Sequence, residues 1–119
     1  MAVSTGLLSV ADLTPEEIQH LLKNAAFLKG GHRGGAAIKG KTIALLFEKP
    51  SLRTRVSFEV AMWQLGGYAM YLSPAEVGLG KRESISDVTR TLSRFVNGIV
   101  ARTFAHETVE LLAKYGSVP

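Results

Sequence analysis

An apolar strand that is broken by a proline and followed by an amphipathic helix constrains this chain more than any other feature. Thr42–Phe47 is apolar after its first residue, which is typical of a strand buried on both faces of a parallel sheet. A proline interrupts the chain shortly afterwards, and Ser51 has the position and the side chain of a helix N-cap. Val56, Val60 and Trp63 recur at helical spacing and are expected to face the core. The stretch therefore predicts a strand–turn–helix unit.

The first turn of this predicted helix is rich in groups that bind anions. Main-chain amides in a first turn have no intrahelical acceptor, and the helix dipole adds partial positive charge there. Arg53 can add a bidentate donor, and the hydroxyls of Ser51 and Thr54 can donate further bonds. The residues are consistent with a phosphate site and equally with a capped helix whose arginines lie in solvent. Spacing alone leaves both interpretations open.

Two further helix starts carry strong local signals. Thr14, Pro15 and Glu17 predict a capping box with proline at the first helical position, and a glycine pair ends that helix. Ser84 and Asp87 predict a second capping box. The helix after Ser84 is expected to bury one apolar stripe, which consists of Ile85, Val88, Leu92 and Phe95.

The remaining segments complete an alternating pattern of helices and strands. Two strands and a last helix are predicted at Tyr68–Leu72, Gly98–Phe104 and His106–Tyr115. Residues 31–35 are expected to form a mobile linker, residues 73–83 a charged loop, and residues 117–119 the start of a fourth strand. Crossovers of this length imply parallel strands with right-handed connections. The predicted fold class is α/β, with three layers and a parallel sheet of about four strands flanked by helices and truncated at the fourth strand.

Length and composition limit the class of protein. A chain of 119 residues with 46% hydrophobic and 20% charged residues suffices for one globular domain. No apolar run reaches the length of a membrane span and no signal-peptide pattern opens the chain, so a cytoplasmic protein is expected. With no cysteine and three separated histidines, no metal site is predicted. The net charge of +4 suits nucleic acid or an anionic small substrate, and the dispersal of the basic residues favours the substrate.

The run from Phe47 to Glu59, with Gln64-Leu65-Gly66-Gly67 after it, resembles the carbamoyl-phosphate motif of the aspartate/ornithine carbamoyltransferases. The family pattern is Ser-Thr-Arg-Thr-Arg within Phe-x-x-x-Ser-x-x-x-Arg-x-Ser-Phe-Glu, and Glu48-Lys49-Pro50 resembles the ornithine branch. One departure is Leu52, where most members carry threonine. The likeness covers nearly the whole chain. It implies that residues 1–119 are an incomplete carbamoyl-phosphate-binding domain without the second domain, which binds the amine substrate.

The resemblance implies roles for individual residues. Ser51, the amide of Leu52, Arg53 and Thr54 would bind the phosphate. Arg102 falls on the family arginine that contacts both the phosphate and the carbonyl oxygen, so Arg53 and Arg102 are the expected catalytic residues. From its place at the end of a strand alone, Arg102 could equally pair with a surface carboxylate.

Other basic residues receive different expectations. Arg55 is expected to orient the site or to be structural. Lys81 and Arg82 lie in a stretch similar to the family loop that, in several members, reaches a neighbouring subunit's active site, and Gly78 stands where some ornithine enzymes carry glutamine. Lys81 and Arg82 are therefore candidates for adding positive charge.

The expected reaction is carbamoyl transfer from carbamoyl phosphate to the δ-amino group of ornithine, which gives citrulline and phosphate in arginine biosynthesis. The resemblance implies no metal and no organic cofactor, ornithine binding by the missing domain, and a homotrimer or a multiple of it for the complete protein. No contact with nucleic acid or membrane is expected. Two alternatives stay open: another acceptor amine (aspartate, putrescine or an acylated ornithine), and a non-catalytic phosphate-binding module.

Overall fold

A computed structural model describes residues 6–32, 36–81 and 83–119. Its helices and strands, in chain order, are η1 (Val10–Asp12), α1 (Pro15–Lys29), β1 (Thr42–Phe47), α2 (Leu52–Gln64), β2 (Tyr68–Leu72), α3 (Pro74–Val77), α4 (Ile85–Ser93), β3 (Gly98–Arg102) and α5 (His106–Tyr115). Most of the linker predicted at residues 31–35, together with Arg82, lies outside the described residues.

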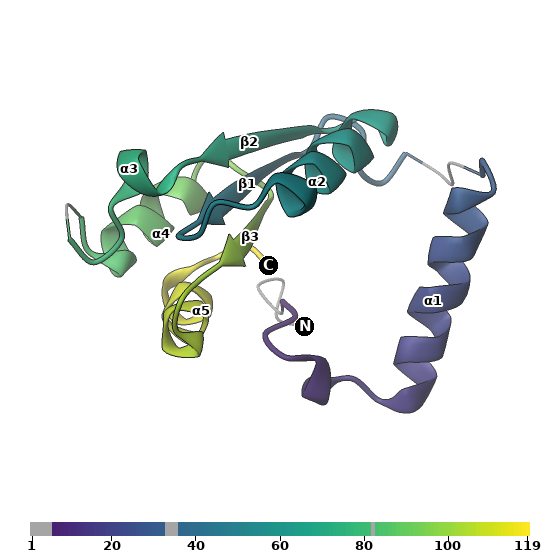
Figure 1. Ribbon diagram of the computed structural model, residues 1–119, viewed down its shortest axis with the longest axis horizontal. Coiled ribbons are helices and arrows are strands. Elements are labelled where there is room, and N and C mark those ends of the chain that lie inside the picture. Colours follow the sequence, from purple (N-terminus) through teal and green to yellow (C-terminus); the bar gives the residue numbers. More distant parts are fainter. Residues whose placement is uncertain (1–5, 33–35, 82) are drawn as a thin grey trace.

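The predicted α/β class is confirmed by a parallel three-stranded sheet in the order β2-β1-β3 (Figure 1). The core lies along the central strand, where Ala44–Phe47 is at most 1% exposed. The amide of Ile99 in β3 donates to the carbonyl of Pro119 at 2.8 Å. Pro119 therefore lies beside β3, where the sequence predicts the start of a fourth strand.

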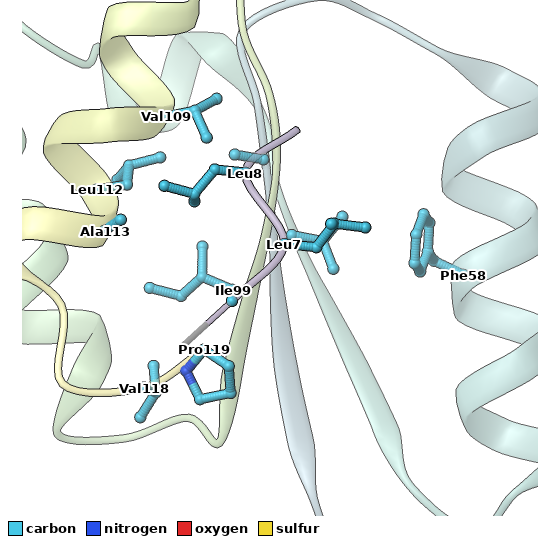
Figure 2. A pocket seen from close by; sticks show the side chains of 12 residues that line it. Leu7, Leu8, Phe58, Ile99, Val109, Leu112, Ala113, Val118 and Pro119 are labelled. Carbon is cyan, nitrogen blue, oxygen red and sulfur yellow. The ribbon is translucent and has the colours of Figure 1, made fainter. Parts of the chain in front are cut away.

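Helices cover both faces of the sheet. Figure 2 shows the strands edge-on, with α2 on one side and α5 on the other, and α4 packs against α5. The turn that ends α2 brings the chain close to the start of β1, where the amide of Tyr68 donates to the carbonyl of Lys41 at 2.9 Å. A Cβ at Gly67 would lie 2.7 Å from Met62 Cε and 2.9 Å from the carbonyl oxygen of Lys41, so a larger residue does not fit there.

The predicted core face of α2 is wrong. Val56, Val60 and Trp63 are 47%, 46% and 77% exposed. The buried residue of the helix is Met62, and Phe58 on the same face is half-buried. Both faces of this helix carry apolar residues at helical spacing. The periodicity therefore could not tell which of them packs on β1 and β2.

The other helices differ from the prediction in smaller ways. In α4, Val88 is buried as expected, but the helix ends before Phe95, which is 79% exposed. Thr89 is fully buried instead, and its Oγ1 donates to the carbonyl of Ile85 at 2.6 Å. The loop predicted at residues 73–83 contains the one-turn helix α3, and β3 ends at Arg102 rather than Phe104.

The first helix, α1, begins as predicted but stands apart from the sheet (Figure 1). Thr14 and Glu17 form both bonds of the capping box, at 3.1 and 2.9 Å. No residue of α1 is buried, and Leu22 and Phe27 are more than half exposed. No helix among the described residues combines the length and the apolarity that crossing a bilayer requires.

Candidate anion site at the carboxyl edge of the sheet

The carboxyl ends of β1 and β3 meet at one edge of the sheet. Phe47, the last residue of β1, pairs with Arg102, the last residue of β3. Beyond the strands, the amide of Glu48 donates to the carbonyl of Arg102 at 2.8 Å, and Glu48 Oε1 accepts from the amide of Phe104 at 3.1 Å. The chain leaves β1 towards α2 and β3 towards α5, on opposite faces. Neighbouring strands whose connections diverge in this way leave a crevice at their carboxyl ends, where α/β proteins bind ligands.

The first turn of α2 opens at this edge with free donors. Ser51 occupies the N-cap position as predicted, but its side chain makes no capping hydrogen bond. The first intrahelical bond runs from the amide of Arg55 to the carbonyl of Ser51, at 3.1 Å. The amides of Leu52, Arg53 and Thr54 precede that bond and have no intrahelical acceptor. Three amides and a hydroxyl are therefore available to an anion.

Charge at the first turn of α2 differs from that of the other helices. Among the α-helices in the described part of the chain, α1, α3, α4 and α5 all carry a carboxylate in the first turn, whereas α2 carries none. Carboxylates stabilise a helix N-terminus through the helix dipole, and cations destabilise it. Arg53 at this position therefore costs helix stability unless a negative group binds there, whereas Arg55 already pairs with Glu59.

Arg53 and Arg102 both lie at the carboxyl edge and both are exposed. Within residues 6–32, 36–81 and 83–119, neither guanidinium group takes part in a hydrogen bond or an ion pair. The fold brings the backbone of Arg102 against Glu48, three positions before Ser51. The convergence of both guanidinium groups on one phosphate stays a prediction.

A small pocket of about 110 Å³ lies at the same edge, between α3 and the ends of β1 and β3. Lys81 lines it, so this candidate residue does lie at the carboxyl edge, whereas Arg82 falls outside the described residues. Lys49 Nζ lies 5.2 Å from the centroid of the Phe104 ring, which forms another part of the wall. Neither Arg53 nor Arg102 lines this pocket. The positive groups are thus distributed along an open edge.

Sequence reasoning did not predict the structural contacts of Glu48 and Lys49. It treated them as a family signature, whereas Glu48 joins the ends of β1 and β3 and Lys49 lies over Phe104. The available signal was their place directly after a buried strand, where ligand-binding groups gather. Arg55, which the sequence leaves as orienting or structural, lies 3.9 Å from the Tyr71 ring centroid and pairs with Glu59.

An apolar cavity lies away from this edge. It has a volume of about 360 Å³ between α2 and α5. Leu7 points toward Phe58 of α2 and Leu8 toward Val109 and Leu112 of α5 (Figure 2). The described residues of its walls include no charged side chain, so they do not suit an anion. Among the described residues, no three histidine or carboxylate side chains lie close enough together to hold a metal ion.

Comparison with known protein families assigns most of the chain to one model. Residues 6–119 match the family described as "Aspartate/ornithine carbamoyltransferase, carbamoyl-P binding domain". Similar curated proteins include the ornithine carbamoyltransferases of Thermus thermophilus, 54% identical over 113 residues, and Pyrococcus horikoshii, 51% identical over 116 residues. Each match covers 95% of this chain but only 38% and 37% of the relative. The chain thus spans well under half the length of these relatives.

Solved structures of ornithine carbamoyltransferases and of an N-acetyl-L-ornithine transcarbamylase share the fold. The ornithine carbamoyltransferase from Thermus thermophilus aligns with a TM-score of 0.85 at 54% identity, covering 95% of this chain and 39% of that one. The anabolic ornithine carbamoyltransferase from Campylobacter jejuni aligns with a TM-score of 0.90 at 35% identity, covering 97% and 37%. An N-acetyl-L-ornithine transcarbamylase aligns with a TM-score of 0.85 at 36% identity, covering 97% and 41%.

Proposed function

This chain belongs to the aspartate/ornithine carbamoyltransferase family, and from that premise we propose that it supplies the carbamoyl-phosphate half of an ornithine carbamoyltransferase active site. The proposed reaction transfers the carbamoyl group to the δ-amino group of ornithine and gives citrulline and phosphate. The observation that carries the proposal is the first turn of α2, which has free amides, two arginines and no carboxylate at the carboxyl edge of the sheet.

The phosphate of carbamoyl phosphate is the proposed ligand of this turn. The amide of Leu52 and the side chains of Ser51, Arg53 and Thr54 would donate to its oxygens. Leu52 is 75% exposed and contributes through its main chain, so the departure from threonine removes no amide donor. Charge-assisted bonds from a guanidinium group and from first-turn amides are among the strongest that a protein offers to phosphate. The dipole of α2 acts in the same direction.

Arg102 is proposed to contact both the phosphate and the carbonyl oxygen. The uncharged amine attacks the carbonyl carbon, the carbonyl oxygen becomes an oxyanion, and the C–O bond to phosphate breaks. A fixed guanidinium group stabilises the oxyanion as it develops, which is often the largest catalytic contribution an enzyme makes. Arg53 would stabilise the departing phosphate. This chemistry needs positioning and electrostatic stabilisation of both substrates, and calls for no metal or organic cofactor.

The rest of the proposal concerns a longer protein. Because the relatives are more than twice as long as the match, ornithine binding is assigned to a second domain. A homotrimer, or a multiple of it, would bring Lys81 and Arg82 of one subunit near a neighbour's site. Arginine biosynthesis in the cytoplasm is the proposed setting. The high identity to proteins named ornithine carbamoyltransferase supports ornithine over aspartate, putrescine or an acylated ornithine as acceptor.

Calorimetric titration of this chain with carbamoyl phosphate tests the proposed binding half. We expect saturable binding that inorganic phosphate competes and that Arg53→Ala weakens at least tenfold, since one charge-assisted hydrogen bond contributes roughly 1.5–3 kcal/mol. Arg94→Ala, which removes an exposed arginine at the end of α4, is the matched control and should bind as the unmodified chain does. A folded chain that shows no heat of binding with millimolar carbamoyl phosphate contradicts the proposal.

A citrulline assay then separates catalysis from binding. Citrulline formation from carbamoyl phosphate and ornithine by a protein that includes the amine-binding domain supports the transferase. Saturable binding without turnover in such a protein supports the phosphate-binding module instead. Substituting aspartate, putrescine or N-acetylornithine for ornithine in the same assay identifies the acceptor.

A further inference from the structure

The two arginines in the first turn of α2 are in different situations. Arg53 has no partner in the described part of the chain. The guanidinium carbon of Arg55 lies 3.9 Å from the centroid of the Tyr71 ring, and its Nε donates to Glu59 Oε1 at 2.5 Å. Stacking on an aromatic face and pairing with a carboxylate are both favourable for a guanidinium group. Arg55 is therefore held by β2 and by its own helix.

Tyr71 connects this contact to the ends of the strands. Its ring meets the ring of Phe47 edge-on, with centroids 5.6 Å apart and an interplanar angle of 90°. Phe47 is 1% exposed, ends β1 and pairs with Arg102 at the end of β3. A chain of contacts thus runs from the first turn of α2 through Tyr71 and Phe47 to the strand end that carries Arg102.

We propose that Arg55 is a positioning residue, which fixes the first turn of α2 against β2 so that the amides of Leu52 to Thr54 and the side chain of Arg53 face one anion. This inference rests on the proposed function for the identity of the anion, the phosphate group of carbamoyl phosphate. It assigns Arg55 no contact with the substrate.

The structure explains why the first turn needs such a contact. Ser51 does not cap the helix through its side chain, and no carboxylate in the turn opposes the two arginines. The turn therefore lacks the local bonds that hold the starts of α1 and α4. A tertiary contact replaces them and leaves the first amides free. An N-cap bond from a side chain would hold the same turn but would occupy one of those amides.

Affinity for carbamoyl phosphate, measured by calorimetry on the whole chain, is the first test. We expect Arg55→Ala to weaken binding by roughly 5- to 30-fold, the range expected from losing one such contact. Arg90→Ala is a matched control, because the Arg90 guanidinium carbon lies 4.9 Å from the Tyr115 ring centroid, in the α4–α5 layer. Its affinity should equal that of the unmodified chain. Equal affinity for Arg55→Ala and Arg90→Ala overturns the inference while leaving the proposed function in place.

Variants of Tyr71 separate positioning from direct contact. Tyr71→Phe keeps the ring and should bind normally, whereas Tyr71→Leu should weaken binding as much as Arg55→Ala does. The double variant should lose no more than either single variant, because both remove the same contact. Weak binding by Arg55→Ala with normal binding by Tyr71→Leu would show that Arg55 touches the phosphate itself, and would overturn the inference.

A ligand-free measurement keeps this test independent of the proposed function. Backbone ¹⁵N order parameters at Leu52, Arg53 and Thr54 report fast motion of the turn. We expect them to fall in Arg55→Ala and Tyr71→Leu and to stay unchanged in Arg90→Ala. If the unmodified chain binds no carbamoyl phosphate, the proposed function fails, and the order parameters still decide whether Arg55 positions the turn. Unchanged order parameters in Arg55→Ala overturn the inference that Arg55 positions the turn.

Discussion

The helices α2 and α4 both start at a serine, yet the two starts are built differently. The Ser84 hydroxyl oxygen accepts a hydrogen bond from the amide of Asp87 at 3.1 Å, and Asp87 also places a negative charge in the first turn of α4. The Ser51 side chain makes no capping bond, and the first turn of α2 carries Arg53 and Arg55 in place of an acid. The start of α4 uses its own serine and aspartate to cap the helix. The start of α2 leaves its amide donors and its positive charge available to a bound anion. The difference supports the proposal that the start of α2 serves binding, whereas the start of α4 serves stability.

Removing an arginine at the carboxyl edge of the sheet should have the largest effect. In a full-length protein that forms citrulline, we expect Arg53→Ala or Arg102→Ala to lower kcat/KM by on the order of 10²–10³, the usual cost of losing one transition-state donor. Steady-state citrulline assays measure it, with Arg94→Ala as a surface control. Near-normal turnover in either variant would falsify the role assigned to that arginine.

The serines themselves give a second, smaller test of the comparison. Ser84→Ala should lower the free energy of unfolding by about 1 kcal/mol, because it removes an N-cap bond. Ser51→Ala should change that free energy by less than about 0.5 kcal/mol, since Ser51 makes no cap bond. Urea unfolding followed by circular dichroism measures both. The comparison fails if Ser51→Ala destabilises the chain as much as Ser84→Ala does.

A carboxylate placed at the α2 start should make it resemble the α4 start. Leu52→Glu changes a residue that is 75% exposed, so the core is untouched. We expect the free energy of unfolding to rise by about 0.3–1 kcal/mol through the helix dipole and the two neighbouring arginines. Carbamoyl phosphate should bind more weakly, because the carboxylate occupies the positive site. Leu52→Gln is the uncharged control, and unaltered affinity in Leu52→Glu would count against an anion site there.

Local chemistry accounts for what sequence reasoning predicted correctly. The capping box of Thr14 and Glu17 spans four residues and forms as predicted, because both bonds depend on neighbours in the chain. The apolar run of β1 likewise predicts a central strand, since a parallel strand with both faces covered must be apolar along its length. The start of α2 was predicted from the adjacent Pro50 and Ser51, which are also local signals. None of these required knowledge of a distant partner.

The buried face of a helix and the hydrogen-bond partner of a side chain were not predictable in this way. Both sides of α2 carry apolar residues at helical spacing, and packing on the sheet buried Met62 rather than Val60 or Trp63. The half-built cap at Ser84 shows the same limit, because Asp87 has the position of a capping-box residue but its carboxylate makes no return bond to the Ser84 amide. A spacing argument identifies candidate faces, and long-range contacts choose between them.

By itself, the sequence determined the strand–turn–helix unit, the parallel α/β class and the run of donors from Ser51 to Thr54, because each depends on residues within a few positions of one another. Only the tertiary structure decided that Arg55 is held by Tyr71 while Arg53 has no partner among the described residues, and that the end of β3 lies beside Glu48. The physical reason is that these contacts join segments brought together by the pairing of β1 with its two neighbours. No local pattern in the chain encodes that pairing.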